Sequence, residues 1–132
     1  MKYLISAGPT REKIDPVRFL SNRSTGKMGY ALAAAAFRAG HEVILVSGPV
    51  CLAAPEGVEL INVESAAEMA EAVKSRAASA EVVIMSAAVA DYRPVSTFAD
   101  KMKKGEGRLA IELERTEDIL AALGKVKPSG QT

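Results

Sequence analysis

The chain has 132 residues, of which 48% are hydrophobic and 25% charged, and its formal net charge is +1. This length fits one domain with a modest core, and the near-neutral charge predicts no general attraction to nucleic acid or to a membrane surface. No apolar run approaches the roughly 20 residues that span a bilayer. The single cysteine, Cys51, excludes an internal disulfide and fits a reducing compartment. We therefore predict one cytoplasmic domain over residues 1–132.

Short apolar runs alternate with helical patterns along the chain. Buried strands are predicted at four of these runs, residues 3–7, 42–47, 58–63 and 82–88. Charges mixed into a fifth run predict an edge strand over residues 109–113. Helices are predicted over residues 26–39, 66–79 and 117–123, the second with Ser65 and Glu68 as a capping box. Residues 8–24 and 89–107 are predicted loops, and residues 125–132 a linker-like tail.

This alternation predicts the fold class. Mostly apolar strands separated by helices are typical of a parallel sheet that is covered on both faces. We expect an α/β fold, a Rossmann-like three-layer sandwich with a mainly parallel sheet that is incomplete at its C-terminal side. Ligands of such sheets bind beyond the carboxyl ends of the strands. The loops that follow Ala7, Ser47 and Ala88 are therefore where a site is expected.

The loop that leads into the first helix is one candidate. Its helix start offers backbone N–H groups that favour an anion, at Ser24, Thr25 and Gly26. Cations surround this point, namely Arg18, Arg23 and Lys27. Asn22 lies among them and could orient a carbonyl or acyl group. The alternatives are that Ser24 or Thr25 simply caps the helix, that the arginines are solvated and that Asn22 forms a turn.

Two later loops and a helix start offer further candidates. Asp91 follows a strand that ends in small residues, so it could accept from ribose hydroxyls or hold a metal ion, or it could cap the turn before Pro94. Three lysines in residues 101–104 suit a polyphosphate, although a solvated charge run is the more common explanation. Glu117 and Asp118 form an acidic pair at a helix start, where simple capping is the alternative.

Standard nucleotide motifs are absent. No G-x-G-x-x-G follows the first strand, and Ser47 and Gly48 stand where a ribose-binding carboxylate is expected. Gly26 and Lys27 are followed by Met28, which breaks the phosphate-loop pattern. An NAD(P)-dependent reductase is therefore the less favoured alternative.

Several segments in this order resemble the phosphopantothenoylcysteine synthetase domain of the bacterial bifunctional coenzyme A biosynthesis flavoproteins. They are ISAGPTREKIDPVRFLSNRSTGKMGYALA, VILVSGPV, SAAVADYRP, KMKK and EDIL, between residues 4 and 123. The resemblance is to the N-terminal, nucleotide-binding portion of that domain. It implies a ligase that joins 4′-phosphopantothenate to cysteine with CTP and Mg²⁺. An acyl-cytidylate is the implied intermediate, and the implied products are 4′-phosphopantothenoylcysteine, CMP and pyrophosphate.

The resemblance also implies residue roles. Lys101 would neutralise the triphosphate, Asn22 would hold the acyl-cytidylate for attack by cysteine, and Arg18 would act beside them. The implied nucleotide-binding residues are Met85, Ser86, Ala87, Asp91, Lys101, Glu117, Asp118, Ile119 and Leu120. The implied substrate-binding residues are Arg18, Asn22, Ser24, Gly26 and Ala88. Asp91 is in addition the candidate metal ligand.

The sequence departs from the family pattern in three respects. Thr25 replaces a serine, and the segment Arg115–Asp118 replaces an asparagine-proline-aspartate approach to the last helix, with Asp118 in register. The family continues beyond residue 132 with a nucleotide loop, a lysine-bearing helix and a dimerising region, so we leave a homodimer open. We also expect no flavin-binding decarboxylase domain before Met1. A non-catalytic or split nucleotide-binding module of the same fold is therefore the main alternative function.

Overall fold

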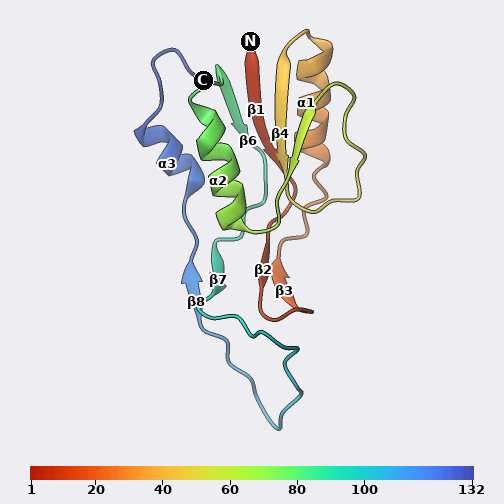
Figure 1. The fold of residues 1–132 in the computed structure, drawn as a ribbon, viewed down its shortest axis with the longest axis vertical. Coiled ribbons are helices and arrows are strands. Elements are labelled where there is room, and N and C mark those ends of the chain that lie inside the picture. Colours follow the sequence, from red (N-terminus) through yellow and green to blue (C-terminus); the bar gives the residue numbers. More distant parts are fainter.

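A four-stranded parallel sheet forms the centre of the molecule (Figure 1). In the computed structural model, which describes residues 1–132, its strands are β1 (Lys2–Ala7), β4 (Glu42–Ser47), β5 (Glu59–Asn62) and β6 (Val82–Met85). Their order is β5-β4-β1-β6, which confirms the predicted α/β fold with a mainly parallel sheet. The chain moves outward from β1 to β5 and then returns to the other side of β1. The direction in which strands are added thus reverses between β1 and β6, and the region beyond the carboxyl ends of these two strands is the switch point, where open α/β sheets bind ligands.

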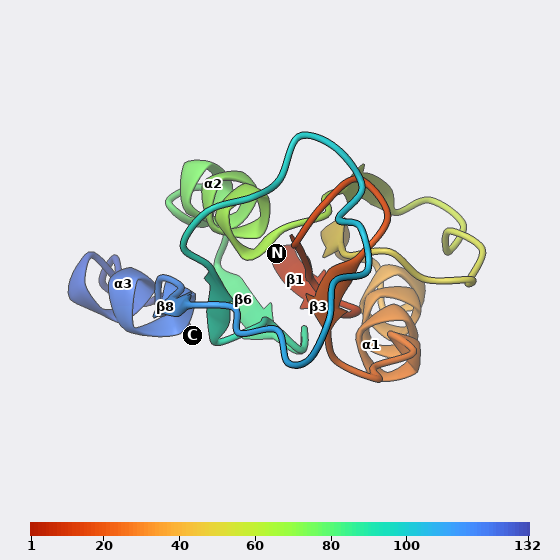
Figure 2. The ribbon, with the colours of Figure 1, turned by 90° about the horizontal axis from the view of Figure 1, so that it is seen from below.

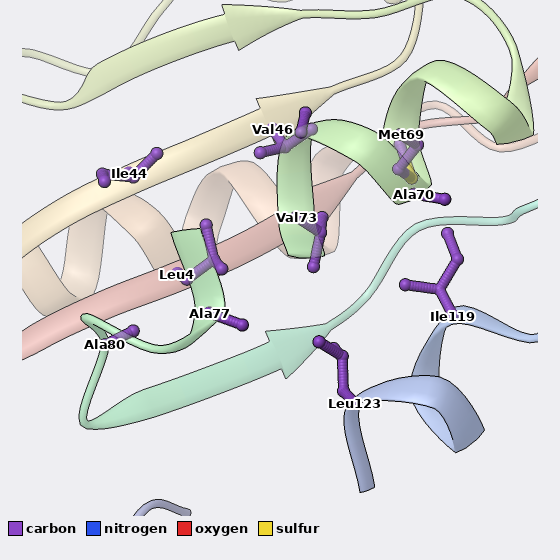
Figure 3. Packing of buried hydrophobic residues seen from close by; sticks show 11 residues of the cluster. Leu4, Ile44, Val46, Met69, Ala70, Val73, Ala77, Ala80, Ile119 and Leu123 are labelled. Carbon is purple, nitrogen blue, oxygen red and sulfur yellow. The ribbon is translucent and has the colours of Figure 1, made fainter. Parts of the chain in front are cut away.

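Helices cover both faces of the sheet. Helix α1 (Lys27–Arg38) packs Tyr30 and Ala33 against a face that includes Ile5. Helices α2 (Ala66–Ala77) and α3 (Ile119–Lys125) cover the other face, which includes Leu4 (Figure 3). Successive strand residues point to opposite faces, so a strand that is buried on both sides is apolar throughout. No helix has the length and apolar character needed to cross a membrane.

The start of α2 uses a modified form of the predicted capping box. Ser65 Oγ accepts a hydrogen bond from Glu68 N at 3.1 Å, as expected. The Glu68 carboxylate, however, accepts from Glu64 N at 2.7 Å rather than from Ser65 N. The reciprocal bond is therefore displaced by one residue toward the N-terminus.

Two antiparallel ribbons extend beyond the carboxyl ends of the sheet strands. Strands β2 (Arg11–Lys13) and β3 (Phe19–Ser21) form a hairpin within the predicted loop 8–24. Strand β7 (Tyr92–Pro94) interrupts the predicted loop 89–107 and pairs with β8 (Leu113–Arg115). The predicted edge strand over 109–113 is therefore wrong: β8 starts at its last residue and lies outside the sheet. Its charged side chains fit this exposed ribbon.

Other predicted boundaries also shift. The fourth sheet strand ends at Met85 rather than residue 88. Helix α3 begins at Ile119 because the Asp118 side chain accepts from Ala121 N at 2.9 Å and so caps the helix. The predicted linker-like tail is instead attached to the sheet: Thr132 exchanges backbone hydrogen bonds with Glu81 and Val83, at the amino end of β6. Both termini lie at the end of the sheet where the strands begin, opposite the two ribbons (Figure 1).

Close packing of α1 on β1 yields a testable prediction. A Cβ atom at Gly29 would lie 2.4 Å from Ala7 Cβ and 3.1 Å from the Ser6 carbonyl oxygen. We expect Gly29→Ala to lower the free energy of unfolding by about 1–3 kcal/mol in urea titrations followed by circular dichroism. Gly124→Ala in α3 is the matched control, because a Cβ there has no neighbour within 4 Å. It should be neutral or stabilising by up to about 1 kcal/mol, and equal responses would contradict this packing.

Candidate functional site

A pocket of about 440 Å³ opens beyond the carboxyl end of β6. Three segments build its wall, namely the end of β6 with the chain that follows it, the start of β7, and the connection from β8 into α3. The lining contains most of the predicted nucleotide-binding residues, specifically Met85, Ala87, Asp91, Glu117, Asp118, Ile119 and Leu120. Neither Ser86 nor Lys101 is among the lining residues. The structure thus brings together residues from two distant parts of the sequence.

Sequence reasoning missed part of this lining. Tyr92 and Arg115 also line the pocket, and they are directly opposite each other in the β7–β8 ribbon. Thr116 joins the two sides of the pocket, because its N–H donates to the Asp91 carbonyl at 2.9 Å and its hydroxyl to the Ala90 carbonyl. Only the pairing of β7 with β8 reveals these residues, and that pairing spans a long loop.

The three carboxylates of the pocket differ in the contacts that they make within the chain. Asp118 caps α3, as the alternative interpretation held, and Glu117 forms an ion pair with Lys74 at 2.7 Å. Asp91 makes no side-chain hydrogen bond or ion pair within the chain, so the predicted alternative of a turn-capping role has no support. The free Asp91 carboxylate is therefore the acceptor that the pocket offers to a ligand.

The residues present do not form a metal cage. No group of three histidine, cysteine, aspartate or glutamate side chains is close enough together to hold an ion. Mg²⁺ often takes only one or two protein carboxylates and completes its shell with substrate phosphates and water. Asp91 fits that kind of site, with most ligands supplied by a bound polyphosphate.

The start of α1 carries no side-chain cap. Gly26 is the N-cap residue, with a φ of 80°, and Ser24 Oγ accepts from Gly26 N at 3.3 Å without reaching the helix. Capping by Ser24 or Thr25 is therefore wrong, and the first turn contains no acidic residue. Gly8 Cα lies 3.5 Å from the position that a Cβ of Gly26 would occupy. A helix start with free N–H groups thus lies against the carboxyl end of β1, which favours an anion there.

Asn22 lies at the switch point between β1 and β6. Its Nδ2 donates to the Ala88 carbonyl at 3.1 Å, and Thr10 N donates to the same oxygen at 3.3 Å. Ala88 N in turn donates to the Gly8 carbonyl at 2.9 Å. The structure thus brings together Asn22 and Ala88, two of the predicted substrate-binding residues. The hydrogen bond from Nδ2 sets the orientation of the Asn22 side-chain amide.

Arg18 and Lys101 are linked through a loop contact. Arg18 Nη1 donates to Asp15 Oδ2 at 2.8 Å and to the Met102 carbonyl at 3.0 Å. Lys101, the neighbour of Met102, is exposed and makes no ion pair within the chain. Hydrogen bonds from the N–H groups of Met102, Val17 and Arg18 hold the pKa of the Asp15 carboxyl well below its usual range, although burial opposes them.

A second buried carboxylate supports the hairpin. Glu12 is 4% exposed, and its Oε1 accepts from Ala66 N, at the start of α2, at 2.7 Å. Burial raises the pKa of Glu12, which the Ala66 hydrogen bond opposes. Thr10 Oγ1, also buried, accepts from Ala90 N at 2.9 Å. These contacts fix the hairpin between α2 and the chain that leaves β6.

Residues 1–132 match, over the entire chain, the family described as the C-terminal domain of DNA/pantothenate metabolism flavoproteins. The chain belongs to this family. Among the relatives of this flavoprotein C-terminal domain is the coenzyme A biosynthesis bifunctional protein CoaBC of Bacillus subtilis (strain 168). It is 58% identical over 125 residues, which are 94% of this chain and 31% of that protein. The chain therefore spans about a third of the length of this curated relative.

Solved structures agree with the assignment to this flavoprotein C-terminal domain. The crystal structure of the C-terminal domain of CoaBC is 54% identical, with a TM-score of 0.82, and the match covers 96% of this chain and 59% of that one. A Cab2 mutant in complex with phosphopantothenate-cysteine has a TM-score of 0.78 at 18% identity, covering 92% of this chain and 58% of that one, and shares the fold. The comparisons thus show the C-terminal domain of the longer proteins. The N-terminal, nucleotide-binding portion of that domain stays a prediction.

Proposed function

We propose that the chain is the CTP-binding portion of a cytoplasmic phosphopantothenate–cysteine ligase of coenzyme A biosynthesis. The pocket beyond β6 carries this proposal, because it gathers the free Asp91 carboxylate, the small side chain of Ala87 and the start of α3 around one space. Ala88, which lies between the lining residues Ala87 and Val89, accepts a hydrogen bond from Asn22 Nδ2. A nucleotide in the pocket would therefore direct its phosphates toward the switch point beyond the carboxyl ends of β1 and β6. The Cab2 complex, which shares the fold, is consistent with the substrate class.

The proposed reaction has two steps. A carboxylate oxygen of 4′-phosphopantothenate attacks the α-phosphorus of CTP, the bond to the β-phosphate breaks, and pyrophosphate leaves. The cysteine amine then attacks the acyl carbon, CMP leaves with the former carboxylate oxygen, and the amine loses a proton to solvent. Positioned positive charge matters more in such phosphoryl chemistry than a strong base. A site without histidine meets this requirement. The one histidine of the chain, His41, stacks on Tyr3, with 4.8 Å between the ring centroids.

Each predicted residue has a place in this scheme. Lys101 neutralises part of the charge of the triphosphate. Asp91 would help to hold a Mg²⁺ ion, which would lower that charge further. Asn22 holds the acyl-cytidylate at the switch point, with its nitrogen already directed at the Ala88 carbonyl. The groups that bind the phosphopantothenate are Ser24 and Gly26 at the uncapped helix start, Ala88 beside Asn22, and Arg18 in the turn of the β2–β3 hairpin.

Nucleotide selectivity provides a direct test of this function. CTP with Mg²⁺ should raise the Tm of the chain more than ATP or NADPH at the same concentration, because a ligand stabilises the state that binds it. At about 100 times its Kd the expected stabilisation is about 2.7 kcal/mol. Asp91→Asn should reduce the CTP shift and leave the unliganded Tm nearly unchanged, since Asp91 makes no side-chain hydrogen bond. A CTP shift no larger than that of NADPH would contradict the proposal.

A binding module without catalysis is the second candidate, because the match covers 59% of the solved C-terminal domain. The chain is then expected to bind CTP but to release no pyrophosphate from CTP and 4′-phosphopantothenate. Addition of a separate C-terminal piece from a relative should restore pyrophosphate release if the chain is one part of a split ligase. Release by the chain alone would exclude the second candidate.

A further inference from the structure

Residues 95–112 connect β7 to β8 and extend away from the sheet (Figures 1 and 2). The base of this loop is closed by the hydrogen bond from Val95 N to the Glu112 carbonyl. Phe98 N donates to the Ile14 carbonyl at 3.0 Å. Between Phe98 and Glu112, Met102 alone makes hydrogen bonds. Met102 is therefore the residue through which hydrogen bonds attach the lysine segment 101–104 to the rest of the molecule.

Both backbone polar groups of Met102 are bound by the turn of the β2–β3 hairpin. Met102 N donates to Asp15 Oδ2 at 3.0 Å, and the Met102 carbonyl accepts from Arg18 Nη1 at 3.0 Å. Arg18 Nη1 also donates to Asp15 Oδ2 at 2.8 Å. The three residues thus form a closed ring of hydrogen bonds, which we call the Met102 clamp.

Asp15 is the fixed part of the clamp. Its side chain is fully buried, whereas that of Arg18 is 46% exposed. Asp15 Oδ1 accepts from Val17 N at 2.8 Å and from Arg18 N at 2.7 Å, which forms a local turn around Pro16. The other oxygen, Oδ2, is thereby directed at Met102. A buried carboxylate must have its acceptor positions satisfied, so release of Met102 leaves Oδ2 with one partner fewer.

We propose that Asp15 is a positioning residue, which holds Met102 and so fixes the segment Lys101–Lys104 beside Arg18 for contact with nucleotide phosphates. This role rests on the proposed function, whereas the clamp itself does not. Three lysines within four positions repel one another and favour a solvated, extended loop. The clamp opposes that tendency with charge-assisted hydrogen bonds, which are stronger than neutral ones.

Limited proteolysis with trypsin tests the clamp, since the enzyme cleaves after Lys101, Lys103 and Lys104. Asp15→Asn should accelerate cleavage in this segment about tenfold or more, because one N–H of the amide then opposes a backbone N–H. Met102→Pro is a second variant that removes the Met102 donor and leaves the hairpin turn intact; because trypsin does not cleave before proline, its cleavage is scored after Lys103 and Lys104. Glu114→Gln is the matched control: it removes the same charge at the base of the same loop, where the ion pair with Arg93 is half exposed. Its cleavage rate should stay within about twofold of wild type.

Cleavage after Lys74 in α2 reports global unfolding, so the cleavage rate in the lysine segment is compared with the rate after Lys74 in each variant. Titration calorimetry with CTP and Mg²⁺ then tests positioning: Asp15→Asn and Met102→Pro should weaken CTP binding about tenfold, and Glu114→Gln should not. Wild-type cleavage rates in both clamp variants would overturn the clamp. Faster cleavage with unchanged CTP affinity would overturn the positioning role. A wild-type chain that binds no CTP refutes the proposed function and the positioning role together, while the cleavage rates still decide the clamp.

Discussion

Lys101→Gln, made in a full-length bifunctional protein, is expected to abolish formation of the acyl-cytidylate. Lys101 is exposed and makes no ion pair within the chain, so its positive charge is available to a triphosphate. Glutamine keeps much of the length but loses the charge that stabilises the developing phosphate charge. Removal of one such group costs a factor of about 100–1,000 in rate. Pyrophosphate release should therefore fall below detection, while the Tm stays unchanged. Normal release would exclude Lys101 from the first step.

Asn22→Asp should fail at the second step instead. The amide nitrogen donates to the Ala88 carbonyl, and a carboxylate cannot donate and would repel that oxygen. We expect pyrophosphate release to continue while the conversion of acyl-cytidylate to CMP and amide stalls, as seen by chromatography of quenched reactions. Asn62→Asp is the control, because Asn62 is exposed at the end of β5. Failure of Lys101→Gln and Asn22→Asp at the same step would contradict this division of roles.

Glu12→Ala is expected to have the largest effect on stability, lowering the free energy of unfolding by roughly 2–4 kcal/mol. The change leaves Ala66 N, at the start of α2, without its acceptor and opens space in a site that is 4% exposed. Urea titration provides the measurement. Glu68→Ala is an informative comparison, because it also removes an acceptor at this helix start but from an exposed position. It should lose about 1 kcal/mol or less, and an equal loss would contradict the buried role of Glu12.

Glu12→Gln should separate the hydrogen bond from the charge. Burial raises the pKa of Glu12 above 4.5, so the folded state binds its proton more tightly than the unfolded state does. The stability that this provides is present below pH 4.5 and is lost as the pH rises through the folded pKa. Glutamine still accepts from Ala66 N and does not ionise. The variant should therefore gain stability relative to wild type as the pH rises above 4.5, and a difference that does not change with pH would contradict the raised pKa.

The sheet and its helices follow from the sequence because local patterns determine them. Strand β4 was predicted with its observed limits, since its apolar run is bounded by Glu42 and by Gly48. Helix α2 begins where Ser65 predicts it. The two ribbons were missed because they are three residues per strand and polar, and they depend on pairing between separate segments. The turn formed by Asp15 and Pro16 was the local signal that could have revealed the first of them.

The candidate site divides in the same way. The resemblance supplied the residues on each side of the pocket, such as Asp91 and Asp118, but no local pattern predicts that they share one space. Their meeting depends on the β7–β8 pairing, which closes a loop of mixed composition. Asp15 and Glu12 were missed for a different reason. Each lies in a charged stretch, a pattern that predicts solvent exposure. Only the tertiary structure shows the backbone N–H groups that donate to the two carboxylates and so offset the cost of burying them.

Both ends of the chain are attached at the amino edge of the sheet, through Glu42 on one side and Glu81 and Val83 on the other. The pocket, the switch point and the Met102 clamp are all at the opposite edge. The molecule can therefore be immobilised or fused at either terminus with its binding edge directed outward. A biosensor surface that captures the chain by an N-terminal tag should leave the pocket as open to nucleotide as it is in free solution.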